Sequence, residues 1–262
     1  MKEEQKGRRR AGAIIAIASG VALLAGGSTF ALWSASAAFN ANSDVITAGN
    51  LNLVAGGSST SWDVSVGRTD ETANVTDPAT QALDLTFASA TDASSAQANV
   101  NATNQLMGHS VTLGTWLAVP GDTVAVTMPY TITLTGDNLV ADLTVDPSTL
   151  VKEANITNMS FALAVFGADG KQVGTTATVS STSSTTPVNV ATFQANGAGQ
   201  SAGVDDKDAS GNTITTVGTD GTAAVTLVVF GYFNQTTPDR VDATLADTLG
   251  QINATLTQVR NA

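Results

Sequence analysis

The chain has a single histidine, His109, and no cysteine, so the side chains that most often bind zinc are nearly absent. A catalytic zinc site uses two or three His or Cys ligands beside its water, and many metalloproteases place two of them in an H-E-x-x-H helix. Neither pattern occurs in this sequence. The sequence therefore predicts no zinc enzyme, and we interpret His109 as a surface or loop residue.

One serine lies in a pattern that hydrolases use. Residues 199–203 (GQSAG) match G-x-S-x-G, which serves catalysis only where a strand and a helix hold the serine on a tight turn. These residues lie instead in a glycine-rich stretch, and the only histidine precedes the serine, which reverses the order found in α/β-hydrolases. The sequence predicts no catalytic residue and no enzymatic activity.

Asp206, Asp208 and Ser210, followed by Gly211, resemble the first half of a calcium-binding loop, in which oxygen ligands lie two residues apart. The twelfth position of such a loop supplies a bidentate glutamate, and here that position is Val217. A solvated hairpin tip explains the same residues without an ion, and the missing glutamate favours that interpretation. Calcium is thus the single metal with a candidate site, and no cofactor is predicted.

Composition indicates a β-rich protein and argues against binding to nucleic acid. The 262 residues include 11 Lys and Arg against 22 Asp and Glu, a net charge of −11. Five of the basic and two of the acidic residues lie before residue 11, so the remainder is still more acidic, about −14, and would repel phosphate backbones. Charged residues make up only 13% of the chain, against roughly 25% in ordinary soluble domains. Thr, Ser, Asn and Ala must therefore cover the surface, and Thr favours the pleated backbone.

Apolar residues alternate over many short runs, which predicts nine or ten strands and almost no amphipathic helix. The clearest run is 123–135, with Pro129 inside it. Because proline cannot donate a ladder hydrogen bond, this strand is expected to lie at a sheet edge or to bend there. Residues 136–138 form a turn signal, after which 139–145 is expected to return as a strand.

Other runs complete the predicted sandwich. Asp169-Gly170 predicts a hairpin between 158–167 and 173–179, and 223–233 carries enough apolar residues to be buried on both faces. Further strands are expected at 46–53, 62–66, 83–87, 188–193 and 252–259, with loops at 88–105 and 197–212. We predict an all-β, jelly-roll-like β-sandwich over residues 54–262, with two tandem small sandwiches as the alternative.

The N-terminus has the profile of a secretory signal peptide. Three arginines at residues 8–10 precede a largely apolar run over 11–25, and no charged residue follows until Asp44. A basic segment, an apolar segment and then small residues are the features that a signal peptidase recognises. We predict a signal peptide helix over residues 1–38 and a protein that is secreted to the cell surface or extracellular matrix.

The cleavage point is predicted from small residues. Residues 35–37 (ASA) fit the A-x-A rule, so cleavage is expected near Ala37 or Ala38, with Ala31 as a further candidate. An uncleaved anchor is the alternative, since residues 11–38 are long enough to span ~30 Å of hydrocarbon. The membrane would then be contacted only through this leader.

The leader also carries a resemblance to a known family. Residues 26–34 (GGSTFALWS), followed by 46–53 (ITAGNLNL), resemble the alternate signal peptides of the TasA/camelysin family. These are Gram-positive surface proteins whose leader is cut by a SipW-type signal peptidase. Shorter pieces resemble the mature start of the TasA group or actinobacterial members of this exported class: residues 37–40 (AAFN), 119–122 (VPGD), 136–139 (GDNL) and 256–260 (LTQVR).

The resemblance implies a non-enzymatic jelly-roll subunit of an extracellular biofilm-matrix or cell-surface fibre. In such fibres an N-terminal segment of one subunit adds a strand to a neighbouring copy or to a related fibre subunit, which satisfies the open N–H and C=O groups of a sheet edge. Residues 39–53 are the donor candidate here. The alternative is that this segment forms an ordinary first strand of its own domain, and we favour that alternative for Leu51 and Leu53. The apolar donor candidates in the segment are Phe39, Val45, Ile46, Leu51 and Leu53.

A second hypothesis is a monomeric cell-surface module that binds a glycan or another ligand. Trp62, Trp116 and Tyr130 would then line an aromatic platform. The chain has few aromatic residues to fill its core, so burial of these three is the favoured interpretation.

The leader prediction can be checked directly. Since small residues precede both predicted cuts, N-terminal sequencing of the exported protein is expected to begin at Ala38 or Phe39. A secreted or surface-bound protein that keeps Met1 and the apolar run would contradict cleavage and support the anchor.

Overall fold

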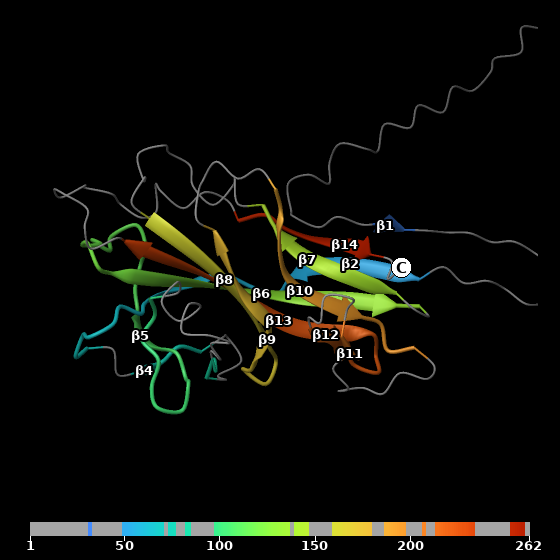
Figure 1. The fold of residues 1–262 in the computed structure, drawn as a ribbon, viewed down its shortest axis with the longest axis horizontal. Coiled ribbons are helices and arrows are strands. Elements are labelled where there is room, and N and C mark those ends of the chain that lie inside the picture. The colour runs from blue at the N-terminus through green and yellow to red at the C-terminus, as the bar shows by residue number, and fades with distance from the viewer. Residues whose placement is uncertain are drawn as a thin grey trace, which may run out of the picture.

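The computed structural model describes residues 31–32, 49–70, 73–76, 82–84, 97–136, 139–146, 159–179, 186–197, 206–207, 213–233 and 252–259. Within these ranges the chain is all-β, with its strands in two sheets and no helix (Figure 1). The same ranges contain no helical segment with the length and apolarity that a bilayer crossing requires. The all-β prediction is confirmed for these residues. The leader helix predicted for 1–38 falls outside them except at Ala31–Leu32, and these two residues form a short strand and not a helix.

The larger sheet is built around β6 (Thr123–Thr135) and β13 (Thr222–Phe233), which pair antiparallel along most of their lengths. Its order is β4–β5–β3–β6–β13–β8–β9, and β2 pairs with β6 beyond the end of β3. The remaining strands of this sheet are β1 (Ala31–Leu32), β2 (Asn50–Ala55), β3 (Thr60–Asp63), β4 (Ala73–Asn74), β5 (Met107–Ser110), β8 (Met159–Gly167) and β9 (Gln172–Val179).

The smaller sheet has the order β11–β12–β10–β7–β14. Its pairs are antiparallel except for β10 and β12, which run parallel. Its strands are β7 (Val140–Val145), β10 (Val188–Gln194), β11 (Asp206–Lys207), β12 (Thr213–Thr216) and β14 (Ala254–Val259).

The inner core lies between the two sheets. Successive side chains of a strand point to opposite faces, and one set from the larger sheet meets the apolar face of the smaller sheet. The buried residues of this core include Leu53, Val124, Ile132, Leu134, Phe161, Leu163, Val165, Leu227 and Val229 of the larger sheet and Leu143, Phe193 and Leu256 of the smaller sheet.

The outer core lies on the other face of the larger sheet. There the alternate residues of β6, β8 and β13 are covered by segments that lie between residues 62 and 106. The outer core consists of Val64, Val75, Leu83, Leu106, Ala125, Ala162, Ala164, Phe166, Val228 and Phe230. β13 is therefore buried on both faces, as its apolar content predicted.

The strongest sequence patterns are confirmed as strands. β6 spans the predicted run from its first residue to its last, and β8 pairs with β9 as the predicted hairpin. Only residues 97–105 of the loop expected at 88–105 are described, and they contain no named strand or helix. Ala98 and Val100 are nevertheless half-buried and pack against the outer core, so this part is not a free surface loop. The strand expected at 62–66 also ends early, since β3 stops at Asp63 and Val66 is 63% exposed in the following turn.

Pro129 does not lie at a sheet edge, and that alternative is wrong. β6 is an interior strand, with β13 on one side and β2 and β3 on the other. Pro129 lies where β2 has ended at Ala55 and β3 has not yet begun at Thr60. Its carbonyl accepts a hydrogen bond of 2.8 Å from Gly56 N, so the missing N–H falls at the break between two strands, where little pairing is lost.

The turn after β6 leads to the other sheet. Residues 139–145 were expected to return beside the preceding run, but β7 pairs with β10 and β14 instead. Leu139 and Leu143 pack into the same inner core as Leu134. The chain therefore passes from one sheet to the other between β6 and β7, as sandwiches require, and the two strands form no hairpin.

Gly221 offers a test of this packing. Its φ is +76°, and a Cβ there would lie 2.5 Å from Thr135 Cγ2 and 3.1 Å from Leu134 O. Gly67 also has a positive φ, +84°, but a Cβ there would meet nothing within 4 Å. Gly67→Ala should lower the free energy of unfolding by about 1–2 kcal/mol for the backbone conformation alone. Gly221→Ala should lower it by clearly more, because of the added clash. Urea denaturation of both variants would measure the difference, and equal losses would contradict the close packing.

Candidate functional site

The outer edge of β2 is the first candidate site. Gly56 N donates to Pro129 O, so the alternation of an antiparallel ladder directs the N–H and C=O groups of Val54 toward β6. The main-chain groups of Leu53 and Ala55 then point away from β6. No strand among the described residues pairs with this part of the edge.

The start of the same edge already holds an extended segment. Ala31 and Leu32 of β1 pair antiparallel with Leu51 and Asn50. Because the groups of Leu51 also point away from β6, this pairing uses the outer edge of β2. The edge is therefore able to accept an added strand in the antiparallel direction.

A second sheet edge lies beside the first. β14 pairs with β7 and is the last strand of the smaller sheet, and it lies against β2. β1, β2 and β14 appear together on the right in Figure 1. Leu53 and Leu256 are buried in the same inner core, with 1% and 5% of their surface exposed. A strand added to β2 would lie over this junction and could direct alternate side chains toward the core.

Two of the predicted donor residues belong to the acceptor side of this edge. Leu51 and Leu53 are buried in the core of their own sandwich as part of β2, which agrees with the alternative favoured for them. The other donor candidates, Phe39, Val45 and Ile46, lie outside the described residues, as do the cleavage candidates Ala37 and Ala38. A donor segment in this chain is therefore limited to residues before Asn50.

A charged cluster lies beside the other half of β6. Arg68 Nη1 lies 3.2 Å from Asp63 Oδ2 and 3.7 Å from Asp122 Oδ1, and Arg68 Nη2 lies 3.1 Å from Asp70 Oδ2. Asp63 is fully buried and Asp122 is 6% exposed, whereas the Arg68 side chain is 39% exposed. The positive charge of one partly exposed guanidinium thus offsets the negative charge of two buried carboxylates, whose burial would cost free energy without it.

The cluster also ties separate segments together. Asp63 Oδ1 accepts hydrogen bonds from the N–H and hydroxyl of Ser65, and Ser65 Oγ accepts one from Thr123 N at 2.9 Å. Asp122 Oδ2 accepts a hydrogen bond of 2.8 Å from Val119 N. These contacts hold the covering layer and the 111–122 segment against β6, so we assign the cluster a structural role. The sequence patterns marked the turn at Asp122 but gave no sign of these partners.

His109 lies near this cluster without completing a metal site. It belongs to β5 and is directly opposite Asp63 in β3, which corrects the expectation of a surface or loop residue. The side chain is half-buried, and its Nδ1 has no hydrogen-bond partner in the described part of the chain. Across the described residues, no three His, Cys, Asp or Glu side chains are grouped to hold a metal.

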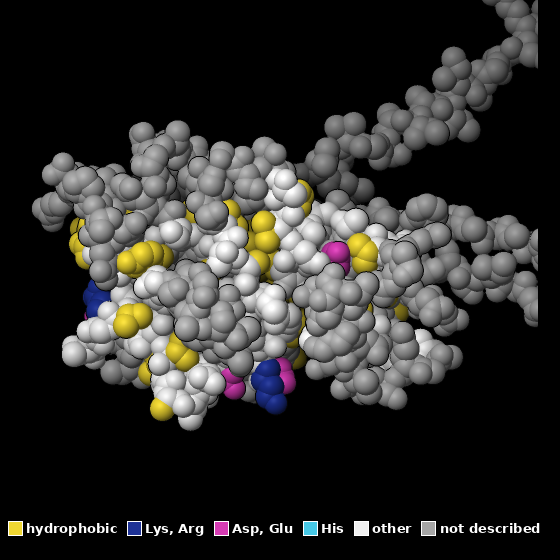
Figure 2. Space-filling view, viewed as in Figure 1, with side chains coloured by type: hydrophobic (Ala, Val, Ile, Leu, Met, Phe, Trp, Pro, Cys, Tyr) yellow, Lys and Arg dark blue, Asp and Glu magenta, His cyan; other side chains and the backbone are white. Residues whose placement is uncertain are grey.

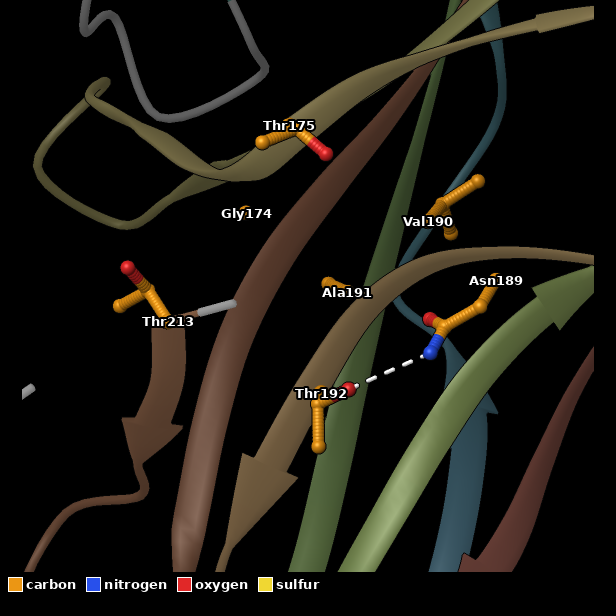
Figure 3. Close-up of a pocket in the computed structure, with 7 residues that line it drawn as sticks. All are labelled: Gly174, Thr175, Asn189, Val190, Ala191, Thr192 and Thr213. Carbon is orange, nitrogen blue, oxygen red and sulfur yellow. Dashed lines mark hydrogen bonds between the residues drawn. The ribbon is translucent and has the colours of Figure 1, made fainter. Parts of the chain in front are cut away.

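A small hollow of about 200 Å³ lies between β9 and β10 (Figure 3). The hydroxyls of Thr175, Thr192 and Thr213 and the amide of Asn189 line it. Thr192 Oγ1 donates to Asp142 Oδ1 at 2.6 Å and accepts from Asn189 Nδ2 at 3.3 Å. Ligand pockets usually measure about 300–1,000 Å³ and carry apolar or aromatic walls, so we assign no ligand to this hollow.

The remaining sequence candidates do not meet in one site. Asp206 lies in β11, which pairs with β12 as one side of a hairpin, while Asp208 and Ser210 fall outside the described residues. The G-x-S-x-G residues 199–203 fall outside them as well.

The three aromatic residues proposed as a glycan platform lie on different faces. Trp62 packs against the outer core, whereas Trp116 and Tyr130 pack against the inner core. They therefore form no common surface, because the larger sheet separates them.

The chain matches no family model, no curated protein and no solved structure.

The charged cluster predicts a pH dependence. Burial raises the pKa of Asp122, against the opposing effects of the Val119 N–H and of Arg68. The folded state therefore binds this proton more tightly than the unfolded chain. This contribution to stability is present at low pH and is lost as the pH rises through the raised pKa. Asp122→Asn removes the titration but keeps an oxygen for Val119 N. The free energy of unfolding of the wild type, relative to this variant, should fall as the pH rises above the ordinary pKa of an aspartate. Urea denaturation at several pH values measures it, and a constant or rising difference would contradict the assignment.

Proposed function

We propose that this chain is a secreted, non-enzymatic structural protein of the cell surface or extracellular matrix. Its copies, alone or with a related fibre subunit, join when an N-terminal segment of one subunit pairs with the β2 edge of the next. The observation that carries this proposal is the outer edge of β2, which has outward main-chain groups at Leu53 and Ala55 and lies against a second edge strand, β14. An exposed edge of this kind is a template for strand addition.

The leader fits the same proposal. Removal of residues 1–38 by a signal peptidase of the SipW type would leave residues 39–49 ahead of β2 as the donor segment. Phe39, Val45 and Ile46 in this tail supply the apolar side chains that an added strand would place over the inner core. We further propose that the two sheets form a jelly-roll-like sandwich.

The surface chemistry supports assembly over catalysis. On the face shown in Figure 2, few charged side chains are visible among the described residues, whose surface there consists mainly of uncharged side chains and backbone. The buried carboxylates are held by Arg68 and by hydrogen bonds, in a structural arrangement. A monomeric glycan-binding module has less support, because the larger sheet separates Trp62 from Trp116 and Tyr130.

Strand donation can be tested at the acceptor edge. Ala55 is exposed and its N–H points away from β6, so Ala55→Pro removes an outward donor while leaving the β2–β6 ladder in place. We expect fibre growth by the processed protein to fall roughly tenfold or more. Negative-stain electron microscopy and sedimentation would record the loss.

Two comparisons make this test specific. Ala55→Ser keeps the N–H and should assemble like the wild type. Deleting residues 39–48 removes the donor but leaves β2 intact, so this protein should melt like the wild type and remain unpolymerised. Normal fibres from either Ala55→Pro or the deletion would rule out donation to this edge.

A further inference from the structure

The short strand β1 belongs to the leader, whereas the edge that it occupies belongs to the sandwich (Figure 1). Ala31 pairs with Leu51 and Leu32 pairs with Asn50, in the antiparallel direction. The cleavage predicted near residues 37–38 falls in the chain between these two strands. The cut would therefore leave β1 on the removed peptide and β2 on the exported protein.

The main-chain groups of Leu51 can serve only one partner strand. Gly56 N donates to Pro129 O, so the even-numbered residues of β2 direct their main-chain groups toward β6. The groups of Leu51 point the other way, and Ala31 lies opposite them. Because adjacent strands lie about 4.7–4.9 Å apart, a second strand cannot lie beside Leu51 at the same time. A donated strand that uses this end of β2 must displace β1.

The cut changes which of the two strands is favoured. While the chain is whole, residues 33–49 connect β1 to β2, and pairing across a short connection corresponds to an effective concentration of about millimolar. After the cut this advantage is lost, and a ladder of two residues is too short to persist by itself. A donated strand can extend beyond Leu51 to the outward groups of Leu53 and Ala55, with which no described strand pairs.

We propose that β1 of the leader occupies the β2 edge of its own chain until the leader is cleaved, and so prevents the uncleaved chain from accepting a strand from a neighbour. The inference rests on the proposed strand donation, because it names the step that makes the acceptor edge available. Cleavage then has two effects: it frees the donor segment, residues 39–49, and it opens the edge that receives this segment. Assembly therefore starts only after the leader is removed.

A disulfide tests the pairing in the uncleaved chain. Leu32 and Asn50 are opposite each other at a position without ladder hydrogen bonds, where Cα atoms lie about 4.5 Å apart. A disulfide can bridge this distance. The chain has no cysteine of its own, so the full-length double variant Leu32→Cys with Asn50→Cys can form a single intramolecular bridge. We expect this bridge to form in most molecules under mild oxidation.

A second pair of cysteines is the matched control. Val54 is exposed, as Asn50 is, and lies on the same face of β2 four residues further along. Leu32→Cys with Val54→Cys should therefore remain mostly reduced under the same conditions. Equal bridging in the two double variants would overturn the proposal, because it would show that the leader has no defined position on the edge.

Cleavage in vitro tests the release of the edge. A site for a specific protease, inserted after Ala38, allows the folded full-length chain to be cut with the bridge closed or reduced. With the bridge between positions 32 and 50 closed, the cut protein should stay monomeric, because the leader remains on β2. After reduction it should form fibres at the rate of the cut protein without cysteines. Sedimentation and negative-stain electron microscopy would follow both reactions.

Hydrogen exchange at Leu51 measures the edge without fibres. In the Ala55→Pro background, which keeps the protein monomeric, cutting should speed exchange of the Leu51 amide at least about tenfold. Unchanged exchange, or bridged protein that assembles as fast as reduced protein, would overturn the inference and leave strand donation standing. If the cut, reduced protein without Ala55→Pro stays monomeric although Leu51 exchange accelerates, strand donation fails. The inhibitory role of β1 then fails with it.

Discussion

The antiparallel pairing of β6 with β13 is the constraint on which the rest of the structure depends. β13 carries Leu227 and Val229 on one face and Val228 and Phe230 on the other, and all four are buried. A strand that is apolar on both faces cannot lie at a surface, so the chain must cover it twice. The smaller sheet covers one face, and the segments between residues 62 and 106 cover half of the other. The remaining part of that face carries mainly Thr, Asn and Ala, which water can solvate, and no described segment belongs to a core cluster there.

The same pairing determines where edges remain. β6 is flanked by β13 along most of its length, but its other side is shared by β3 and β2, which are separated at Pro129. The proline separates two short partner strands and so leaves β2 as an independent edge strand beside β14. Natural sheets usually protect such edges with charge or with short strands. Here β2 carries only Asn, Leu, Val and Ala, which leaves it suited to pairing with another chain.

Electrostatics limits the kinds of contact that this protein can make. The chain has 22 acidic residues and few basic ones, and Arg68 is committed to the carboxylates of Asp63, Asp70 and Asp122. Little positive charge is left for acidic partners. Main-chain pairing at an edge remains available, because it does not require opposite charges. The proposed contact uses the outward main-chain groups of β2.

The sequence by itself determined the strands whose apolar residues alternate without interruption. β6, the β8–β9 hairpin and the double burial of β13 could be predicted because side-chain alternation is a property of a single strand. The tertiary structure alone decided which strands pair, since that choice depends on residues far apart in the chain. It placed β7 in the opposite sheet from β6, made Leu51 and Leu53 part of their own core, and put Trp62 on the opposite face from Tyr130. It also formed the cluster around Arg68, which no local pattern marks because its partners come from separate segments. Strand pairing and burial depend on how all the apolar faces of the chain pack against one another. A local sequence pattern describes only one of the two partners in each contact.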